Sequence, residues 1–69
     1  NQKKFSVEKD EFFIDLLFYN YRLHCFVVIE LKIGEFKPEF AGKLNFYINV
    51  VNEQLKGEKD NQTIGILLC

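Results

Sequence analysis

The sequence lacks several features that would assign it to a common class. No apolar run approaches the roughly 20 residues that a membrane-spanning helix needs, and no signal-peptide pattern is present. An excess of charge is also missing, because nine basic and ten acidic residues give a net charge of −1. This balance argues against a protein held on nucleic acid by bulk charge alone, but it does not exclude a nuclease whose metal meets the phosphate.

The chain is also poor in cysteine, histidine and proline. Cys25 and Cys69 are most simply buried thiols in a reducing, cytoplasmic setting, with a disulfide or a zinc pair as less favoured alternatives. At 69 residues the chain makes at most one small domain, covering residues 1–69. Because it opens without Met and stops directly after an apolar strand, we expect this domain to be a fragment of a longer polypeptide.

The sequence does contain a succession of apolar segments, some with the composition of strands and one with the spacing of a helix. Residues 3–7, 11–19, 24–33 and 63–69 read as strands, with a polar turn at residues 8–10, and Pro38 opens a predicted helix over residues 38–56. The helix is predicted from one stripe, made by Phe40, Leu44, Tyr47, Ile48, Val51 and Leu55. The fold class is therefore α/β (α+β), a β-β-β-α-β unit whose last strand is parallel to residues 24–33. One helix covers one face of the mixed sheet, and the other face must pack on further sequence or on a second copy in a homodimer.

Three ionisable residues interrupt the two most apolar strands. Asp15 lies inside the run 12–19, and Glu30 and Lys32 lie inside the run 26–33. Burying such groups costs several kcal/mol each unless they are paired or bind a metal. A chain that only had to fold would carry apolar residues or Thr at these positions, so a functional site is expected here.

The strand period places these residues on one face. Pairing Tyr19 with His24 sets Asp15 opposite Val28 and diagonal to Glu30, whereas a slip of two residues sets Asp15 directly opposite Glu30. A slip of one residue would separate them. On one face, Asp15 and Glu30 can hold Mg²⁺ or Mn²⁺, and Lys32 can orient water or stabilise the charge on a pentacovalent phosphate.

Asp15 followed by Glu30-Leu31-Lys32 resembles the signature of the PD-(D/E)xK nuclease superfamily, and residues 13–19, 27–32, 36–43 and 45–47 are similar to a bacterial branch long catalogued as uncharacterised. The resemblance implies a restriction-endonuclease-like fold and a Mg²⁺-dependent DNA nuclease. Asp15 and Glu30 would be the metal ligands, Lys32 the catalytic lysine, and DNA the partner. Members often carry Gln and Tyr on the following helix. Lys43 and Tyr47 stand at that spacing, so both are candidate substrate contacts, and the Lys departs from the pattern. Another acidic ligand, often on a first helix, has no counterpart before Lys3.

Simpler alternatives remain open at this point. Backbone groups or Arg22 could satisfy Asp15, and Glu30 with Lys32 could be an ordinary ion pair on one strand face. The chain could then be a nucleic-acid-binding or assembly module with little activity, or a structural interaction domain whose uncovered sheet face is the working surface. Metal binding and cleavage separate these hypotheses.

Overall fold

The computed structural model describes residues 3–7 and 10–69. The turn expected at residues 8–10 lies mostly outside these residues. The elements are, in order, β1 (Lys3–Val7), β2 (Asp10–Ile14), β3 (Leu16–Asn20), β4 (Cys25–Leu31), α1 (Pro38–Gln54) and β5 (Ile64–Leu68). In this part of the chain, no helix is long and apolar enough to cross a membrane.

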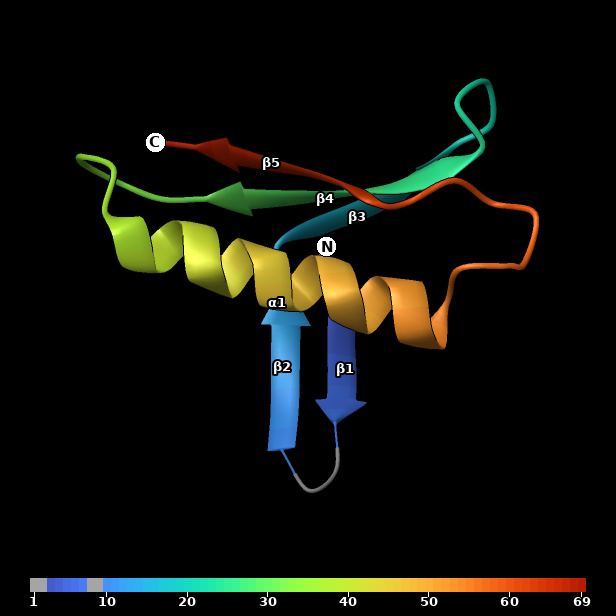
Figure 1. The fold of residues 1–69 in the computed structure, drawn as a ribbon. Coiled ribbons are helices and arrows are strands. Elements are labelled where there is room, and N and C mark those ends of the chain that lie inside the picture. Colours follow the sequence, from blue (N-terminus) through green and yellow to red (C-terminus); the bar gives the residue numbers. More distant parts are fainter. Residues whose placement is uncertain (1–2, 8–9) are drawn as a thin grey trace.

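The central element is a three-stranded mixed sheet with the order β3-β4-β5. β3 pairs with β4 antiparallel and β5 pairs with β4 parallel, as the β-α-β order predicts. α1 lies along one face of this sheet, and β1 and β2 form a separate antiparallel hairpin that projects away from it (Figure 1). The α+β fold class of the sequence prediction is confirmed, and the arrangement agrees with the restriction-endonuclease-like fold that the resemblance implies.

The single strand predicted over residues 11–19 is wrong, because the chain bends at Asp15 and divides it into β2 and β3. The physical reason lies in the Asp15 side chain. Its Oδ2 accepts a hydrogen bond from the backbone N–H of Leu31 at 3.0 Å. In a continuous strand a backbone carbonyl would accept this bond, so the side chain replaces the backbone here. β2 then leaves the sheet and pairs with β1 instead.

The register of the β3–β4 hairpin also differs from the first of the two predicted alternatives. Asn20, not Tyr19, forms the last pair, with Cys25 as its partner. The Asn20 Oδ1 accepts the N–H groups of Arg22 and Leu23, each at 3.0 Å, which stabilises a turn of the same length placed one residue later. His24 has a φ of 52°, a left-handed conformation that does not fit a strand, so β4 starts one residue later than predicted.

The core lies between the sheet and α1. It consists of Ile14, Val28, Tyr47, Val50 and Val51, with Leu17, Phe26 and Leu44 packed against it. The predicted helical stripe included Tyr47 and Val51 but missed Val50, and α1 ends at Gln54 rather than residue 56. Gly65 permits close packing here, because an added Cβ would lie 2.5 Å from the Ile48 Cδ1 atom and 3.1 Å from the Leu44 Cγ atom.

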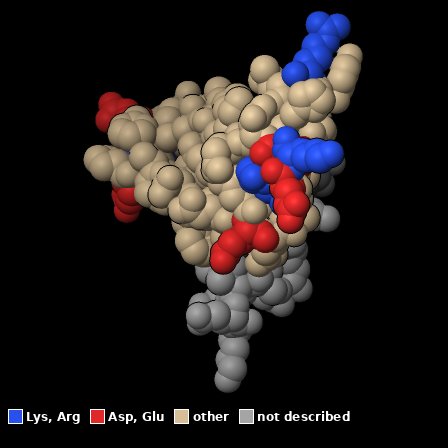
Figure 2. Space-filling view, turned by 45° about the vertical axis from the view of Figure 1, so that its right-hand side comes forward, with Lys and Arg blue, Asp and Glu red and all other residues tan. Residues whose placement is uncertain are grey.

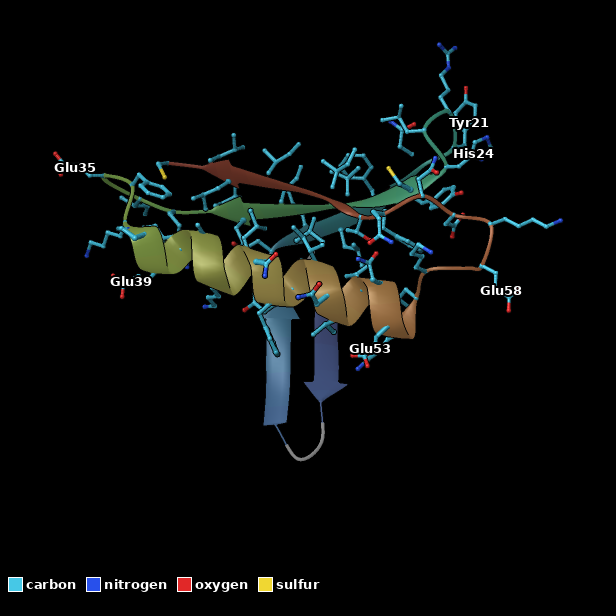
Figure 3. The ribbon with its side chains drawn as sticks, viewed as in Figure 1. Tyr21, His24, Glu35, Glu39, Glu53 and Glu58 are labelled. Carbon is cyan, nitrogen blue, oxygen red and sulfur yellow. The ribbon has the colours of Figure 1, made fainter. Side chains whose placement is uncertain are left out.

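The opposite face of the sheet is apolar, and it is exposed along its two outer strands and at the end of β4. The registers place six residues with exposed fractions of 36–51% on this side: Leu16, Phe18, Leu31, Ile64, Ile66 and Leu68. Cys25 and Val27, in the central strand β4, lie on the same side and are buried. Side chains project from the sheet on the side away from α1 in Figure 3. We call these six residues the open face. Both cysteines are free thiols, but only Cys25 is buried and Cys69 is exposed, so the expectation of two buried thiols is wrong for Cys69, which follows the end of β5.

Candidate functional site

The observed register brings Asp15 and Glu30 to matching positions. Leu16 pairs with Ile29, so the next position along β4 sets Asp15 opposite Glu30. This is the second predicted alternative, the slip of two residues, and it keeps both carboxylates on one face of the hairpin. That face is the covered one, because Val28, two residues before Glu30, packs in the core under α1.

Glu30 is the most unusual residue of the site. Its exposed fraction is 3%, and its Oε1 atom has no hydrogen-bond partner among the described residues. The other oxygen, Oε2, lies 3.6 Å from Lys32 Nζ, so the predicted ion pair exists. This contact involves Oε2 and leaves Oε1 unexplained. A buried oxygen without a partner destabilises the fold, and it is the atom that a cation could bind.

Asp15 accepts a hydrogen bond from a backbone group, as expected if Asp15 has a purely structural role. Its Oδ2 accepts the Leu31 N–H, immediately after Glu30 in the sequence. The contact fixes the position of the carboxyl group beside the end of β4. Asp15 is half-buried, so a ligand can still approach it from solvent.

α1 supplies three side chains on the same side of the sheet. The Lys32 Nζ atom lies 5.1 Å from the centroid of the Phe40 ring, and the Lys43 Nζ atom lies 5.8 Å from the Tyr47 ring. Lys43 is exposed, whereas Tyr47 is buried. The sequence analysis named Lys43 and Tyr47 but missed Phe40 as part of this group. Its place at the start of the helical stripe, close to the end of β4, was the available signal.

The pKa of the Tyr47 phenol is shifted by burial and by the nearby charged groups. Burial raises the pKa of the Tyr47 phenol above its ordinary value of 10.0, and the charge of Glu30 raises it further. Lys32 opposes this rise, while Asp15 adds to it. The three charged residues named in the sequence analysis therefore all influence the pKa of Tyr47. Because this pKa is raised, the phenol stays neutral at physiological pH.

The far end of the sheet has a different, structural arrangement. Tyr19 donates a hydrogen bond of 2.7 Å to Asp60 Oδ1, and the Gly57 N–H donates to Asp60 Oδ2 at 2.9 Å. These two bonds lower the pKa of Asp60. Figure 3 places Tyr21 and His24 at this end of the molecule. Glu35, in the loop after β4, and Glu39, in the first turn of α1, lie at the opposite end. His24 is exposed in the turn before β4, at the end of the sheet away from the candidate site.

The surface charge follows the balanced composition. On the face shown in Figure 2, basic and acidic side chains are interspersed and no extended basic area covers it. Any affinity for nucleic acid from this face would therefore rest on individual contacts, not on a broad positive field.

The donor set fits a magnesium-type ion. Among the residues that the structure describes, no group of three or more His, Cys, Asp or Glu side chains gathers as a metal cluster. Mg²⁺, however, is commonly bound by one or two carboxylates, with waters and substrate phosphate completing its shell. The pair Asp15 and Glu30, with the unpartnered Glu30 Oε1, meets that requirement.

Comparison with known proteins gives consistent results. A family model described as "YhcG PDDEXK nuclease domain" matches residues 1–69. The chain is 35% identical over 68 residues to the Escherichia coli (strain K12) protein named "Putative nuclease YhcG". That alignment covers 99% of this chain but 18% of the relative. No solved structure gives a significant match.

Proposed function

Because the chain belongs to the YhcG PDDEXK nuclease domain family, we propose that it hydrolyses phosphodiester bonds in DNA with the help of Mg²⁺ or Mn²⁺. The observation that carries the proposal is Glu30. A fold of this size gains nothing from a buried carboxylate whose Oε1 has no hydrogen-bond partner among the described residues. The other oxygen, Oε2, lies 3.6 Å from Lys32 Nζ, and the register sets Asp15 opposite Glu30. A binding site for a cation and a phosphate explains all three residues together.

In this proposal each residue has a separate role. Asp15 and Glu30 would hold the ion, which supplies an activated water and polarises the scissile phosphate when bound. The Lys32 ammonium group would donate hydrogen bonds to a phosphate oxygen and offset the charge that develops there. Lys43, exposed on α1, would contact the DNA backbone, and the buried Tyr47 would act through Lys43, whose ammonium group lies over its ring.

The setting of the domain is part of the same proposal. We take residues 1–69 as one nuclease domain, and the relative that it matches is much longer. The free thiols of Cys25 and Cys69 are consistent with a reducing, cytoplasmic location. The activity, substrates and partners of a longer protein would follow from flanking sequence as well.

The test is a cleavage assay with supercoiled plasmid and single-stranded DNA. The 69-residue chain is compared with Glu30→Gln and with Glu58→Gln, a matched control at an exposed position far from the site (Figure 3). We expect Mg²⁺- or Mn²⁺-dependent cleavage that falls by about 100-fold or more in Glu30→Gln, a loss typical of removing one preorganised group from an active site. The control should cleave normally. A folded chain that binds DNA without cleaving it would contradict the proposal.

A second candidate function is favoured by the open face. Six exposed aliphatic and aromatic side chains lie on one sheet surface, and large exposed apolar surfaces often mark sites of association. We propose that this face is the working surface of an assembly module, with a homodimer as the simplest assembly. Sedimentation measurements on the chain and on Ile66→Lys test this idea. A concentration-dependent dimer that the substitution abolishes would support it, and a monomer at all concentrations would contradict it.

A further inference from the structure

The Lys32 side chain lies between an acidic and an aromatic partner. Its Nζ atom is 3.6 Å from Glu30 Oε2 and 5.1 Å from the centroid of the Phe40 ring. The Lys32 backbone is fixed separately, because its N–H donates to the Leu68 carbonyl at 2.8 Å. The side chain itself is 24% exposed, and a lysine has four flexible bonds. These two contacts therefore decide where its ammonium group lies.

Phe40 is held by the start of α1. Pro38 occupies the first turn, where its fixed φ favours helix initiation, and the Phe40 N–H donates to the Lys37 carbonyl at 2.9 Å. The Phe40 side chain is half-buried. The ring is thus a defined surface supplied by the helix, while Glu30 and Lys32 come from β4 and the residue after it.

The two partners of Lys32 are not equivalent. A cation bound at Glu30 Oε1 would weaken the contact of Lys32 with Oε2, because it neutralises the shared carboxylate and repels the ammonium group. The attraction of the Phe40 ring for the ammonium group does not depend on that carboxylate, because it comes from the ring quadrupole. When Glu30 is engaged, Phe40 is the partner that remains.

We propose that Phe40 is a positioning residue that holds the Lys32 ammonium group beside Glu30 through its ring face. The inference rests on the proposed function, in which Lys32 acts on the phosphate. The ring keeps the lysine from swinging into solvent, and so raises the fraction of molecules in which the ammonium group is correctly placed. Phe40 itself touches neither substrate nor metal.

Three variants test this role. Phe40→Leu keeps the apolar contact but removes the ring, Phe40→Tyr keeps a ring, and Phe36→Leu is the matched control, since Phe36 is a phenylalanine that is 56% exposed in the loop before α1. We expect Phe40→Leu to lower kcat by about 3- to 30-fold, the rate equivalent of one cation–π contact, with KM unchanged. Phe40→Tyr should restore the rate, and Phe36→Leu should leave it unchanged.

A spectroscopic measurement separates positioning from general structure and does not need activity. In the metal-free chain, the Lys32 side-chain protons should show an upfield ring-current shift by NMR. The shift should disappear in Phe40→Leu and persist in Phe40→Tyr and Phe36→Leu. Thermal unfolding of each variant shows whether the fold is retained.

The outcomes are distinct. Loss of the Lys32 shift together with a lower kcat in Phe40→Leu alone supports the proposal. Unchanged Lys32 shifts, or a rate loss that Phe40→Tyr does not reverse, would overturn it. A wild-type chain that shows the ring-current shift but never cleaves DNA would overturn the proposed function, and it would support only the structural half of this inference, the contact between Lys32 and Phe40.

Discussion

Replacing Glu30 with Gln should stabilise the metal-free protein while it removes activity. In the wild type, Glu30 is 3% exposed, and among the residues that the structure describes its Oε1 has no hydrogen-bond partner, while its Oε2 lies 3.6 Å from Lys32 Nζ. Leaving a buried polar atom unsatisfied costs about 1–3 kcal/mol, and more when the group is charged. The amide has the same shape and no charge, so its burial costs less.

The opposing effects are small. A partly exposed ion pair such as Lys32–Glu30 contributes about 0–1 kcal/mol, and the freed ammonium group retains the Phe40 ring and access to water. One N–H of the new amide also stays unsatisfied. The net gain in the free energy of unfolding is therefore about 1 kcal/mol, which raises Tm by about 4–8 °C for a domain of this size.

The assay is thermal unfolding followed by circular dichroism, with and without Mg²⁺. At ten times its Kd, the ion should stabilise the wild type by about 1.4 kcal/mol and the variant far less, so the difference between the two proteins should shrink or reverse. Glu58→Gln serves as the control and should not change Tm. A metal-free Glu30→Gln variant that melts about 4 °C or more below wild type would refute the reasoning, because Glu30 would then be a structural residue.

Three further predictions concern packing, pH and the bend. Gly65→Ala should lower the free energy of unfolding in urea by about 1–3 kcal/mol, since the new Cβ overlaps Ile48, and wild-type stability would disprove this close approach. The hydrogen bond from Tyr19 lowers the pKa of Asp60 below 3.8, so its stabilisation is present above that pH and is lost as the pH falls through the folded pKa. Asp60→Asn should flatten this acid dependence of Tm, and an unchanged pH profile would contradict it. Asp15→Ala should cost about 0.5–1.5 kcal/mol by removing the acceptor of the exposed Leu31 N–H, whereas Asp15→Asn should keep the acceptor and lose only cleavage. Equal unfolding curves for the two variants would argue against that role.

Much of the fold follows from the period of the sequence. The stripe from Phe40 to Leu55 gives α1, and the apolar run around Val28 gives β4. The β-α-β order makes β5 parallel to β4, because a strand that returns after a helix enters the sheet in the same direction. These features depend on residues close together in the chain, so local patterns are sufficient to predict them.

The candidate site was predicted in part. The period of two places Glu30 and Lys32 on one face, and the helical period brings Lys43 next to Tyr47. The position of Asp15 relative to Glu30 required the register, and the sequence left two alternatives that kept them on one face. The Asn20 side chain and the left-handed His24 select between them, because they place the four-residue turn at residues 21–24 rather than 20–23.

The sequence by itself determined the helix, the order of the strands and which charged residues interrupt apolar segments. Only the tertiary structure decided that the chain bends at Asp15, that Lys32 lies over the Phe40 ring and that one buried oxygen of Glu30 has no hydrogen-bond partner in the described part of the chain. The physical reason is that these three features are contacts between groups from different elements. A periodic pattern reports which face a residue occupies, but only the packed arrangement determines which group lies opposite it.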